Sequence, residues 1–183
     1  MRTPAGKERG KERVYGHFEG VESVRACVEA AVETGVKYLS IYAFSEENWN
    51  RPQAEVDALM ELMVKAMAAE MDKLDRNGVR FMVIGNRERL SPKLNEVIDS
   101  CMAQTAGNET LTLIVFLSYS GKWDIVQAAN KFIAENSQNG EIPQLSAASL
   151  EANLSTADIP DPDLLVRTSG EQRISNYMLW QTA

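Results

Sequence analysis

The chain has 183 residues, of which 44% are hydrophobic and 25% are charged, and its formal net charge is −7 at pH 7. This length predicts one domain over residues 1–183, and the acidic balance argues against general nucleic-acid binding. No apolar run approaches the roughly eighteen residues that cross a bilayer, and the basic N-terminus lacks the apolar core of a secretory signal, so a cytoplasmic protein is expected.

Helical and strand patterns alternate along the chain. Apolar residues at helical spacing predict helices, and near-continuous apolar runs predict buried strands. In chain order the predicted elements are a helix over 21–35, a strand over 37–44, a helix over 53–76, a strand over 79–85, a helix over 91–104, a strand over 110–120, a helix from about 123 to 139, a short helix over 146–154 and a strand over 164–170. This alternation predicts an α/β fold in which a parallel sheet has helices on both faces.

Polar clusters follow three of the predicted strands. They read FSEENWNRP at 44–52, SYSGKWD at 118–124 and RTSGEQRISN at 167–176. Because ligands of open parallel sheets bind outside the carboxyl ends of the strands, these clusters are expected to form one site at one rim. Local positive charge on an acidic chain favours a small anionic ligand there.

The cluster RTSGEQRISN carries two guanidinium groups, on Arg167 and Arg173, and the hydroxyl of Ser175. A tight Ser-Gly turn between the two arginines exposes backbone N–H groups, and this combination suits a phosphate or a diphosphate. The alternative is a surface turn across which Arg167 and Glu171 form an ion pair.

The N-terminal stretch ERVYGHFEG (12–20) places Gly16 and His17 before the first predicted helix, whose leading amides can bind an anion. Arg13 adds a charge-assisted contact in this interpretation. The alternative, more common for such a stretch, is a solvated basic arm with one capping histidine. His17 is the only histidine, which excludes a His-rich metal site. Cys27 and Cys101 fit no metal or redox spacing and are predicted to be reduced thiols in the core.

In the loop FSEENWNRP, Asn48 and Arg51 can donate hydrogen bonds, and Ser45 can donate and accept them. Trp49 either lines the site or packs beneath it, and packing is the more common role for a lone tryptophan. The two adjacent glutamates are not expected to act as a catalytic pair, because neighbouring residues of an extended segment point apart. The methionines of the following helix are more typical of a core than of the wall of an apolar tunnel.

Four stretches, YGHFEG, YAFSEENWNRPQAEVDALMEL, LSYSGKWDIVQA and DLLVRTSGEQRISNYMLWQ, occur in one colinear register from about residue 6 to the end. Together they resemble the cis-prenyltransferases, in particular the bacterial undecaprenyl diphosphate synthases. The resemblance implies condensation of isopentenyl diphosphate with an allylic diphosphate such as farnesyl diphosphate, repeated until an apolar tunnel holds an undecaprenyl chain. It implies that Arg13, His17 and Arg51 contact the allylic diphosphate and that Trp49 borders the substrate.

The resemblance also implies that Arg167, Arg173 and Ser175 hold isopentenyl diphosphate. Asn48, with Ser45, resembles the polar group near the reacting carbons that is implicated in removing a proton after condensation. Mg²⁺ is the cofactor that the family implies, a homodimer is the expected assembly, and contact with a membrane surface is expected only through the lipid product.

The match departs from the family at both ends. The family's Asp-Gly-Asn-Gly-Arg-Trp-Ala block, whose Asp is associated with catalysis and Mg²⁺, would precede Met1, and Pro4 and Ala5 stand where Arg-Trp is expected. The chain stops before the segment with a metal-associated Glu, and Ser118 and Ser120 stand where Asn and Gly are common. The first strand and the metal carboxylates are thus expected to be missing, with weak binding and little turnover. The alternative is a truncated, non-catalytic prenyl-diphosphate-binding or scaffold chain.

Overall fold

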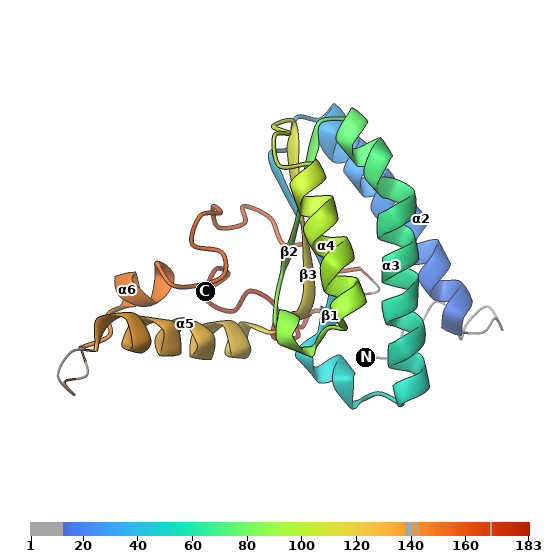
Figure 1. Ribbon diagram of the computed structural model, residues 1–183. Helices are drawn as coiled ribbons and strands as arrows, with labels where there is room; N and C mark the ends of the chain where they lie inside the picture. The colour runs from blue at the N-terminus through green and yellow to red at the C-terminus, as the bar shows by residue number, and fades with distance from the viewer. Residues whose placement is uncertain (1–12, 138–140, 142, 169) are drawn as a thin grey trace. The chain divides into compact units, whose positions relative to one another are not determined.

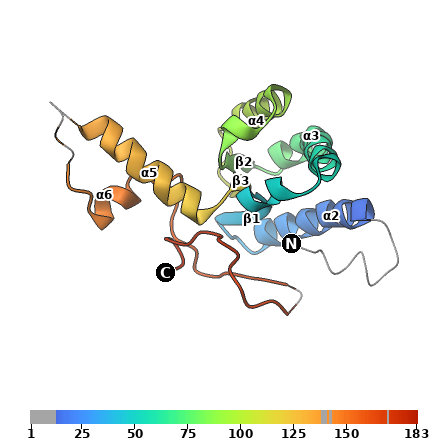
Figure 2. The same ribbon diagram turned by 90° about the horizontal axis from the view of Figure 1, so that it is seen from below.

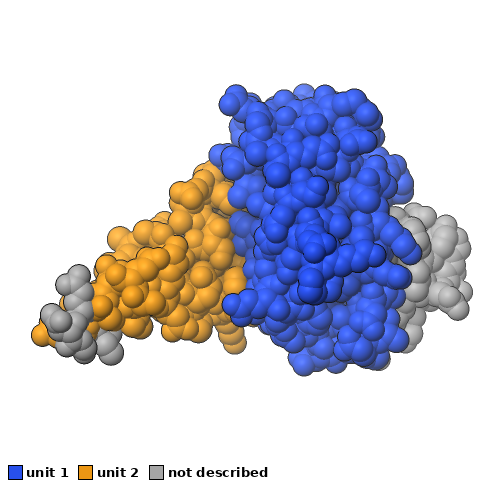
Figure 3. Space-filling model, viewed as in Figure 1, with its two compact units in different colours: residues 1–118 blue, residues 119–183 orange. Residues whose placement is uncertain are grey.

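The computed structural model describes residues 13–137, 141, 143–168 and 170–183, with side chains from Gly20 onward (Figure 1). The chain divides into two compact units, unit 1 (residues 1–118) and unit 2 (residues 119–183), which have different colours in Figure 3. Each unit has a hydrophobic cluster of its own. The single domain predicted for the whole chain stays a prediction.

Unit 1 alternates helices and strands in the predicted order. Its elements are helix α2 (Arg13–Glu33), strand β1 (Tyr38–Ser45), 3-10 helix η1 (Glu46–Asn50), helix α3 (Gln53–Arg76), strand β2 (Val79–Ile84), 3-10 helix η2 (Arg87–Arg89), helix α4 (Pro92–Gln104) and strand β3 (Leu111–Tyr119), whose last residue begins unit 2. The ends of α3 agree with the prediction, and those of α4 and the three strands differ from it by no more than one residue.

Helix α2 begins earlier than the sequence pattern indicated, at Arg13 instead of residue 21. The prediction that Gly16 and His17 precede this helix, at an anion-binding N-terminus, is therefore wrong. Glycine inside a helix costs only about 1 kcal/mol relative to alanine. Gly16 and Gly20 can therefore be accommodated within a helix of this length.

The strands of the described residues form a sheet with the order β1–β3–β2. Strands β2 and β3 are parallel, with Val79 opposite Leu111 and Ile84 opposite Phe116. Parallel neighbours need a crossover connection, which α4 supplies here. Helices α3 and α4 pack against each other and against β2, and α2 lies beside α3 (Figure 2). The α/β class is thus confirmed.

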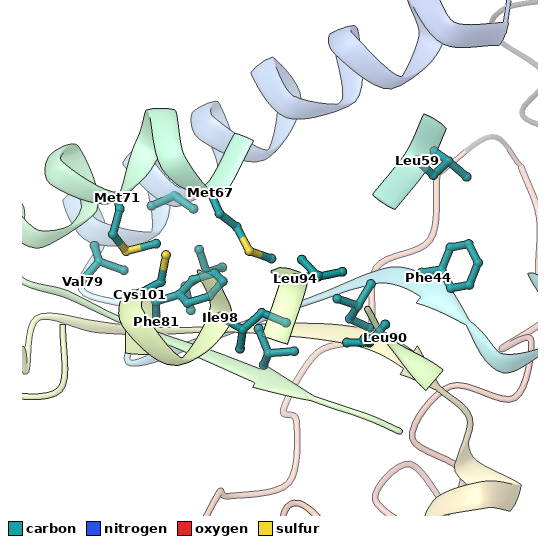
Figure 4. Close-up of a cluster of buried hydrophobic side chains, with 14 of the residues drawn as sticks. Phe44, Leu59, Met67, Met71, Val79, Phe81, Leu90, Leu94, Ile98 and Cys101 are labelled. Atoms are coloured by element: carbon teal, nitrogen blue, oxygen red, sulfur yellow. The ribbon is translucent and has the colours of Figure 1, made fainter. Parts of the chain in front are cut away.

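The core of unit 1 lies between the sheet and these helices (Figure 4). Met67 and Met71 of α3 are buried there with Ile98 and Cys101 of α4 and Phe81 of β2. These methionines therefore have the core role that their spacing favours. Burial raises the pKa of the Cys101 thiol.

The prediction of two core thiols is wrong for Cys27, which is exposed on α2. This helix turns Val28 and Ala31 into the core, where they are 6% exposed. At about 100° per residue, Cys27 lies about 100° from Val28 and about 40° from Ala31 around the helix, so it stands at the edge of the buried face and not within it. Both Cys27 and Cys101 are free cysteines.

Gly85 follows β2 at a point where the backbone of β3 leaves no room for a side chain. Its φ is +148°, and a Cβ atom there would lie 1.9 Å from the carbonyl oxygen of Leu117. The next residue, Asn86, donates its N–H to the carbonyl oxygen of Ser118 at 2.9 Å. Ser118 itself adopts a left-handed φ of 54°. Glycine thus allows the carboxyl ends of β2 and β3 to approach closely.

Unit 2 contains helices α5 (Gly121–Asn136) and α6 (Ala147–Glu151), and most of its other described residues are irregular. Helix α6 is shorter than the predicted 146–154. Ala128 of α5 packs against Leu150 and Leu154 in a small hydrophobic cluster. This cluster is much smaller than the core of unit 1, so polar contacts have a larger share in holding unit 2 together.

The polar interior of unit 2 is organised by Asp124, which is 1% exposed. Its carboxylate accepts hydrogen bonds from the Tyr119 hydroxyl at 3.1 Å, the Gln127 side-chain amide at 2.9 Å and the Ser155 backbone N–H at 2.9 Å. The Gln181 amide approaches the same carboxylate at 3.5 Å. One side chain thus joins α5, the segment after α6 and the C-terminal segment.

The predicted strand over 164–170 is not formed in the described part of that segment, which is irregular. Leu164 and Val166 are 78% and 72% exposed. A strand exists only where a neighbour accepts and donates its backbone hydrogen bonds, and no strand of the described residues pairs with these. The segment has the apolar composition of a strand but lacks a neighbouring strand with which to pair among the described residues.

Candidate active site

The loop after β1 brings several of the predicted site residues together in unit 1. Ser45 ends β1, Asn48 and Trp49 lie in η1, and Arg51 follows η1 directly. The Ser45 N–H donates to the Asn48 side-chain oxygen at 3.1 Å. Ser45 and Asn48, which were expected to act together, are therefore neighbours, and the contact orients the Asn48 amide.

Trp49 is half-buried, and it makes one ring contact and one hydrogen bond through its indole nitrogen. Its ring makes an edge-to-face contact with Phe44, with 5.1 Å between centroids and 75° between planes. Its indole N–H donates to the Ser118 hydroxyl oxygen at 2.9 Å. These contacts are of the kind expected for a packing tryptophan, and the predicted role of Trp49 beside the substrate stays a prediction.

Glu46 completes a cluster around this tryptophan. The Ser118 hydroxyl donates to one carboxylate oxygen of Glu46 at 2.9 Å, and Arg89 of η2 pairs with the other at 2.5 Å. The Arg89 guanidinium carbon lies 4.8 Å from the centroid of the Trp49 ring, which is a cation–π distance. Trp49, Ser118, Glu46 and Arg89, hereafter the Trp49 cluster, form a closed ring of contacts.

Arg51 is a half-buried cation at the start of α3. Its guanidinium pairs with the Glu55 carboxylate at 2.9 Å, with side-chain exposures of 18% and 20%. Glu55 lies in the first turn of α3, where an acidic residue also offsets the positive end of the helix dipole. Arg51 is therefore held near the N-terminus of α3, in a position where a diphosphate would share it with Glu55.

The residues predicted to hold the second diphosphate lie together in unit 2. Arg167 donates to the Ser175 hydroxyl oxygen at 2.8 Å and to the Arg173 carbonyl oxygen. Glu171 pairs with Arg173 at 3.2 Å. The Arg167 guanidinium therefore lies close to Ser175 and to the backbone of Arg173, and the predicted role of these residues stays a prediction.

Unusual backbone conformations shape this segment. Ser175, Asn176 and Met178 have φ values of 50°, 60° and 46°. Asn176 anchors the turn, because its carbonyl oxygen accepts the Gly121 N–H at 2.7 Å and its side-chain oxygen accepts the Lys122 N–H at 3.0 Å. Asn tolerates the left-handed region better than most residues, which fits its position here. Two leading amides of α5 are therefore bonded to Asn176.

Two further predicted site residues belong to helix α2. Arg13 and His17 lie within α2, four residues and about one helical turn apart, and their side chains lie outside the described residues. The predicted convergence of residues from units 1 and 2 on one rim stays a prediction.

A metal site is not apparent in the described part of the chain. Among those residues, no group of three or more His, Cys, Asp or Glu side chains is placed to hold a metal ion. No described side chain is therefore assigned to a metal ion. None of the helices that the structure describes has the length and apolarity that a membrane span needs.

Sequence reasoning missed Glu46 and Arg89 as part of this site. The contact between them joins residues 43 apart in the chain, and no local pattern signals it. Ser118 carried a weak signal, because it lies near the end of a buried strand and begins one of the polar clusters. The extended geometry assumed for the two glutamates was wrong, since the loop forms a 3-10 helix.

The parallel sheet and the polar loops after its strands define a class, the α/β proteins that bind ligands at the carboxyl ends of their strands. Comparison with known proteins identifies the family within that class. The family model described as putative undecaprenyl diphosphate synthase matches residues 5–183, and the chain belongs to this prenyltransferase family.

Individual relatives agree with this assignment. The chain is 47% identical over 177 residues to the isoprenyl transferase of Chromobacterium violaceum, covering 97% of this chain and 68% of the relative. It is 48% identical over 179 residues to a Pseudomonas aeruginosa protein named ditrans,polycis-undecaprenyl-diphosphate synthase ((2E,6E)-farnesyl-diphosphate specific), covering 97% of this chain and 71% of the relative.

A solved structure confirms the fold. The crystal structure of lavandulyl diphosphate synthase from Lavandula x intermedia, in complex with dimethylallyl diphosphate, is similar to this chain with a TM-score of 0.88 and 33% identity. The similarity covers 96% of this chain and 77% of that chain. The predicted family and the predicted cis-prenyltransferase-like fold are both confirmed.

Proposed function

We propose that this chain elongates a cis-prenyl chain by condensing isopentenyl diphosphate with an allylic diphosphate such as farnesyl diphosphate, to make undecaprenyl diphosphate. The observation that carries the proposal is the 48% identity, over 97% of this chain, to a relative named as a farnesyl-diphosphate-specific undecaprenyl-diphosphate synthase. The polar loop after β1 supplies residues of the required chemistry.

The allylic diphosphate is assigned to Arg13, His17 and Arg51. Cationic and hydrogen-bonding groups stabilise the charge that develops on diphosphate as the allylic carbon–oxygen bond breaks. Arg51 supports this role through its position beside the N-terminus of α3, since helix N-termini favour anions. Glu55 keeps the guanidinium in place at 2.9 Å.

Isopentenyl diphosphate is assigned to Arg167, Arg173 and Ser175. The support is their mutual proximity, with the Arg167 guanidinium 2.8 Å from the Ser175 hydroxyl. Guanidinium groups bind phosphate oxygens in bidentate fashion, which orients the substrate as well as attracting it.

Asn48, with Ser45, is assigned to removal of the proton that is lost after the new carbon–carbon bond forms between the two substrates. The Asn48 side-chain oxygen already accepts the Ser45 N–H, so its amide has a defined orientation. Trp49 borders the substrate in this proposal. Met60 and Met63 of α3, which are partly buried against the core, are better candidates for a tunnel wall than the buried Met67 and Met71.

The cofactor and the assembly belong to the proposal as well. Mg²⁺ is included as the metal of the reaction, with no described side chain assigned as its ligand. A homodimer, a cytoplasmic location and contact with a membrane surface through the lipid product are carried by the family resemblance alone.

The test is incorporation of radiolabelled isopentenyl diphosphate by the purified chain in the presence of farnesyl diphosphate and Mg²⁺. Polyprenyl product that disappears on addition of EDTA, and in the Asn48→Ala variant, supports the proposal. Binding of both diphosphates without incorporation would favour the non-catalytic prenyl-diphosphate-binding alternative. A chain that neither binds nor incorporates them would overturn the assignment.

A further inference from the structure

We propose that Glu46 and Ser118 are positioning residues, which fix η1 through the Trp49 cluster so that Ser45, Asn48 and Arg51 face the allylic diphosphate. The inference rests on the proposed function of the same site and assigns roles to two residues outside the predicted binding set. Its basis is the contact geometry of the cluster, its burial and the register of the 3-10 helix.

The hydrogen bonds of the Trp49 cluster have only one possible direction. An indole N–H can only donate, so the Ser118 oxygen must accept from Trp49. The single hydroxyl proton of Ser118 is then directed at Glu46, and the other oxygen of this carboxylate accepts from Arg89. The chain of donors therefore ends on the Glu46 carboxyl group, which also pairs with Arg89, and charge-assisted bonds of this kind are stronger than neutral ones.

Burial makes these contacts difficult to replace with water. Ser118 is 0% exposed, and the Glu46 side chain is 18% exposed. Removing the Ser118 hydroxyl would leave a half-buried indole N–H without its acceptor, and neutralising Glu46 would leave Arg89 stacked on Trp49 without its counter-ion. Arg89 is 44% exposed, so solvent screens its outer side.

The register of η1 explains how this cluster acts on the ligand residues. A 3-10 helix has three residues per turn, so positions three apart share a side. Glu46 and Trp49 share the side that faces Ser118 and Arg89, and both are half-buried.

The remaining positions of the loop divide in the same way. Glu47 and Asn50 share a second side, and both are exposed. Ser45, Asn48 and Arg51 share the third side. The Ser45 N–H donates to the Asn48 side chain, and the Arg51 N–H donates to the Asn48 carbonyl oxygen at 3.1 Å. Holding the first side against the ends of β2 and β3 therefore sets the direction of the third.

The first experiment measures the position of Trp49 without any substrate. Acrylamide quenching is recorded for the wild type, Glu46→Gln and Ser118→Ala, each with its Trp49→Phe counterpart, so that subtraction isolates the emission of Trp49. The expected result is a rise of about twofold in the quenching constant of Trp49 in both variants. Ser118→Ala removes the acceptor of the indole N–H, and Glu46→Gln removes the charged acceptor that orients the Ser118 hydroxyl. The matched control is Glu88→Gln, which neutralises an exposed glutamate in η2 and should leave quenching unchanged. Unchanged quenching in Glu46→Gln would overturn the inference.

The second experiment separates the two substrates. Glu46→Gln and Ser118→Ala are expected to raise the KM for farnesyl diphosphate about tenfold, while the KM for isopentenyl diphosphate changes less than about twofold. The double variant should be no worse than the more affected single variant, because both changes break one chain of bonds. Equal effects on both substrates, or multiplicative effects, would contradict the inference. If the wild type binds no prenyl diphosphate, the proposed function fails, and quenching alone decides whether Glu46 positions Trp49.

Discussion

Two polar, arginine-containing segments of this chain are assigned to phosphate groups, and they are held in place by different parts of the structure. The loop at 45–51 follows a strand of the sheet and is fixed by side chains, with Trp49, Ser118 and Glu46 in contact across unit 1. The segment at 167–176 follows no strand of the described residues and is tied to the start of α5 by Asn176, whose backbone and side-chain oxygens accept the N–H groups of Gly121 and Lys122.

The difference shows that similar chemistry can depend on separate parts of a fold. The first loop is positioned by the hydrophobic core and the sheet of unit 1, so substitutions at the ends of the strands should disturb it. The second contains left-handed residues and is bonded through Asn176 to the start of α5, the helix that carries Asp124. Variants that damage one region and spare the other can therefore test each assignment independently.

Gly85→Ala is expected to have the largest effect and to damage the first loop. A Cβ atom at this position would lie 1.9 Å from the Leu117 carbonyl oxygen, at a φ of +148°. Backbone overlap and conformational strain together should lower the free energy of unfolding by about 3 kcal/mol or more. Urea denaturation followed by circular dichroism measures this. Gly107→Ala is the control, because a Cβ there meets nothing within 4 Å, and an equal loss in both variants would contradict the explanation.

Asp124→Asn is expected to disturb the second segment, with a smaller loss of stability than Gly85→Ala. The carboxylate accepts from Tyr119, Gln127 and Ser155, and an amide in its place would turn a donor toward one of these donors. Leaving buried donors without acceptors should lower stability by about 2 kcal/mol. Limited trypsin digestion should show faster cleavage after Arg167 and Arg173 than in the control Asp158→Asn, which changes an exposed carboxylate. Unchanged cleavage would show that the conformation of this segment does not depend on the Asp124 network.

Arg51→Lys and Arg173→Lys test the two phosphate assignments directly. A lysine keeps the charge and loses the planar fork, so each substitution should weaken one diphosphate contact about tenfold, or roughly 1.4 kcal/mol. Arg51→Lys should raise the KM for farnesyl diphosphate, and Arg173→Lys the KM for isopentenyl diphosphate. Steady-state kinetics with each substrate varied in turn measures both values. The control Arg76→Lys, at an exposed position in the last turn of α3, should change neither.

The Arg25–Glu70 contact between α2 and α3 is expected to give the smallest effect and to depend on pH. The hydrogen bond from Arg25, with the charge of Lys73 nearby, lowers the pKa of Glu70 below its ordinary value of 4.5. A carboxyl with a lowered pKa stabilises the fold above the ordinary value, and this contribution is lost as pH falls through the lowered one. The pair is partly solvated, so Glu70→Gln should cost only about 0.5 kcal/mol at pH 7.

The measurement for this contact is the difference in unfolding free energy between wild type and Glu70→Gln from pH 7 to pH 3. The difference should be constant near neutrality and shrink below about pH 4.5. A difference that grows as pH falls would mean that the assigned direction of the pKa is wrong. Exposed Glu61→Gln on α3 serves as the control.

Much of unit 1 could be predicted because its periodic patterns are strong. Helix α3 and the three strands carry apolar residues at spacings that leave few alternatives, and their predicted ends agree closely with the structure. The early start of α2 could not be predicted, because Gly16 and Gly20 look like breaks in an isolated sequence. The strand expected at 164–170 failed for a related reason, since strand formation depends on a partner and not on the segment alone.

The candidate site shows the same division at the level of single residues. The sequence alone predicted a site at Ser45, Asn48 and Arg51, because polar residues that follow a buried strand mark the carboxyl end of that strand. It could not identify Glu46 and Arg89, because their pairing arises from the meeting of η1 and η2 at the sheet's edge.

The amino-acid sequence by itself determined the family, the α/β class and the residue types that can hold a diphosphate, since these are recorded in local patterns and motifs. Only the tertiary structure decided how the first loop is oriented. A 3-10 register and a buried serine in a left-handed conformation place one side of that loop against the sheet, and such contacts exist only once distant strand ends have come together.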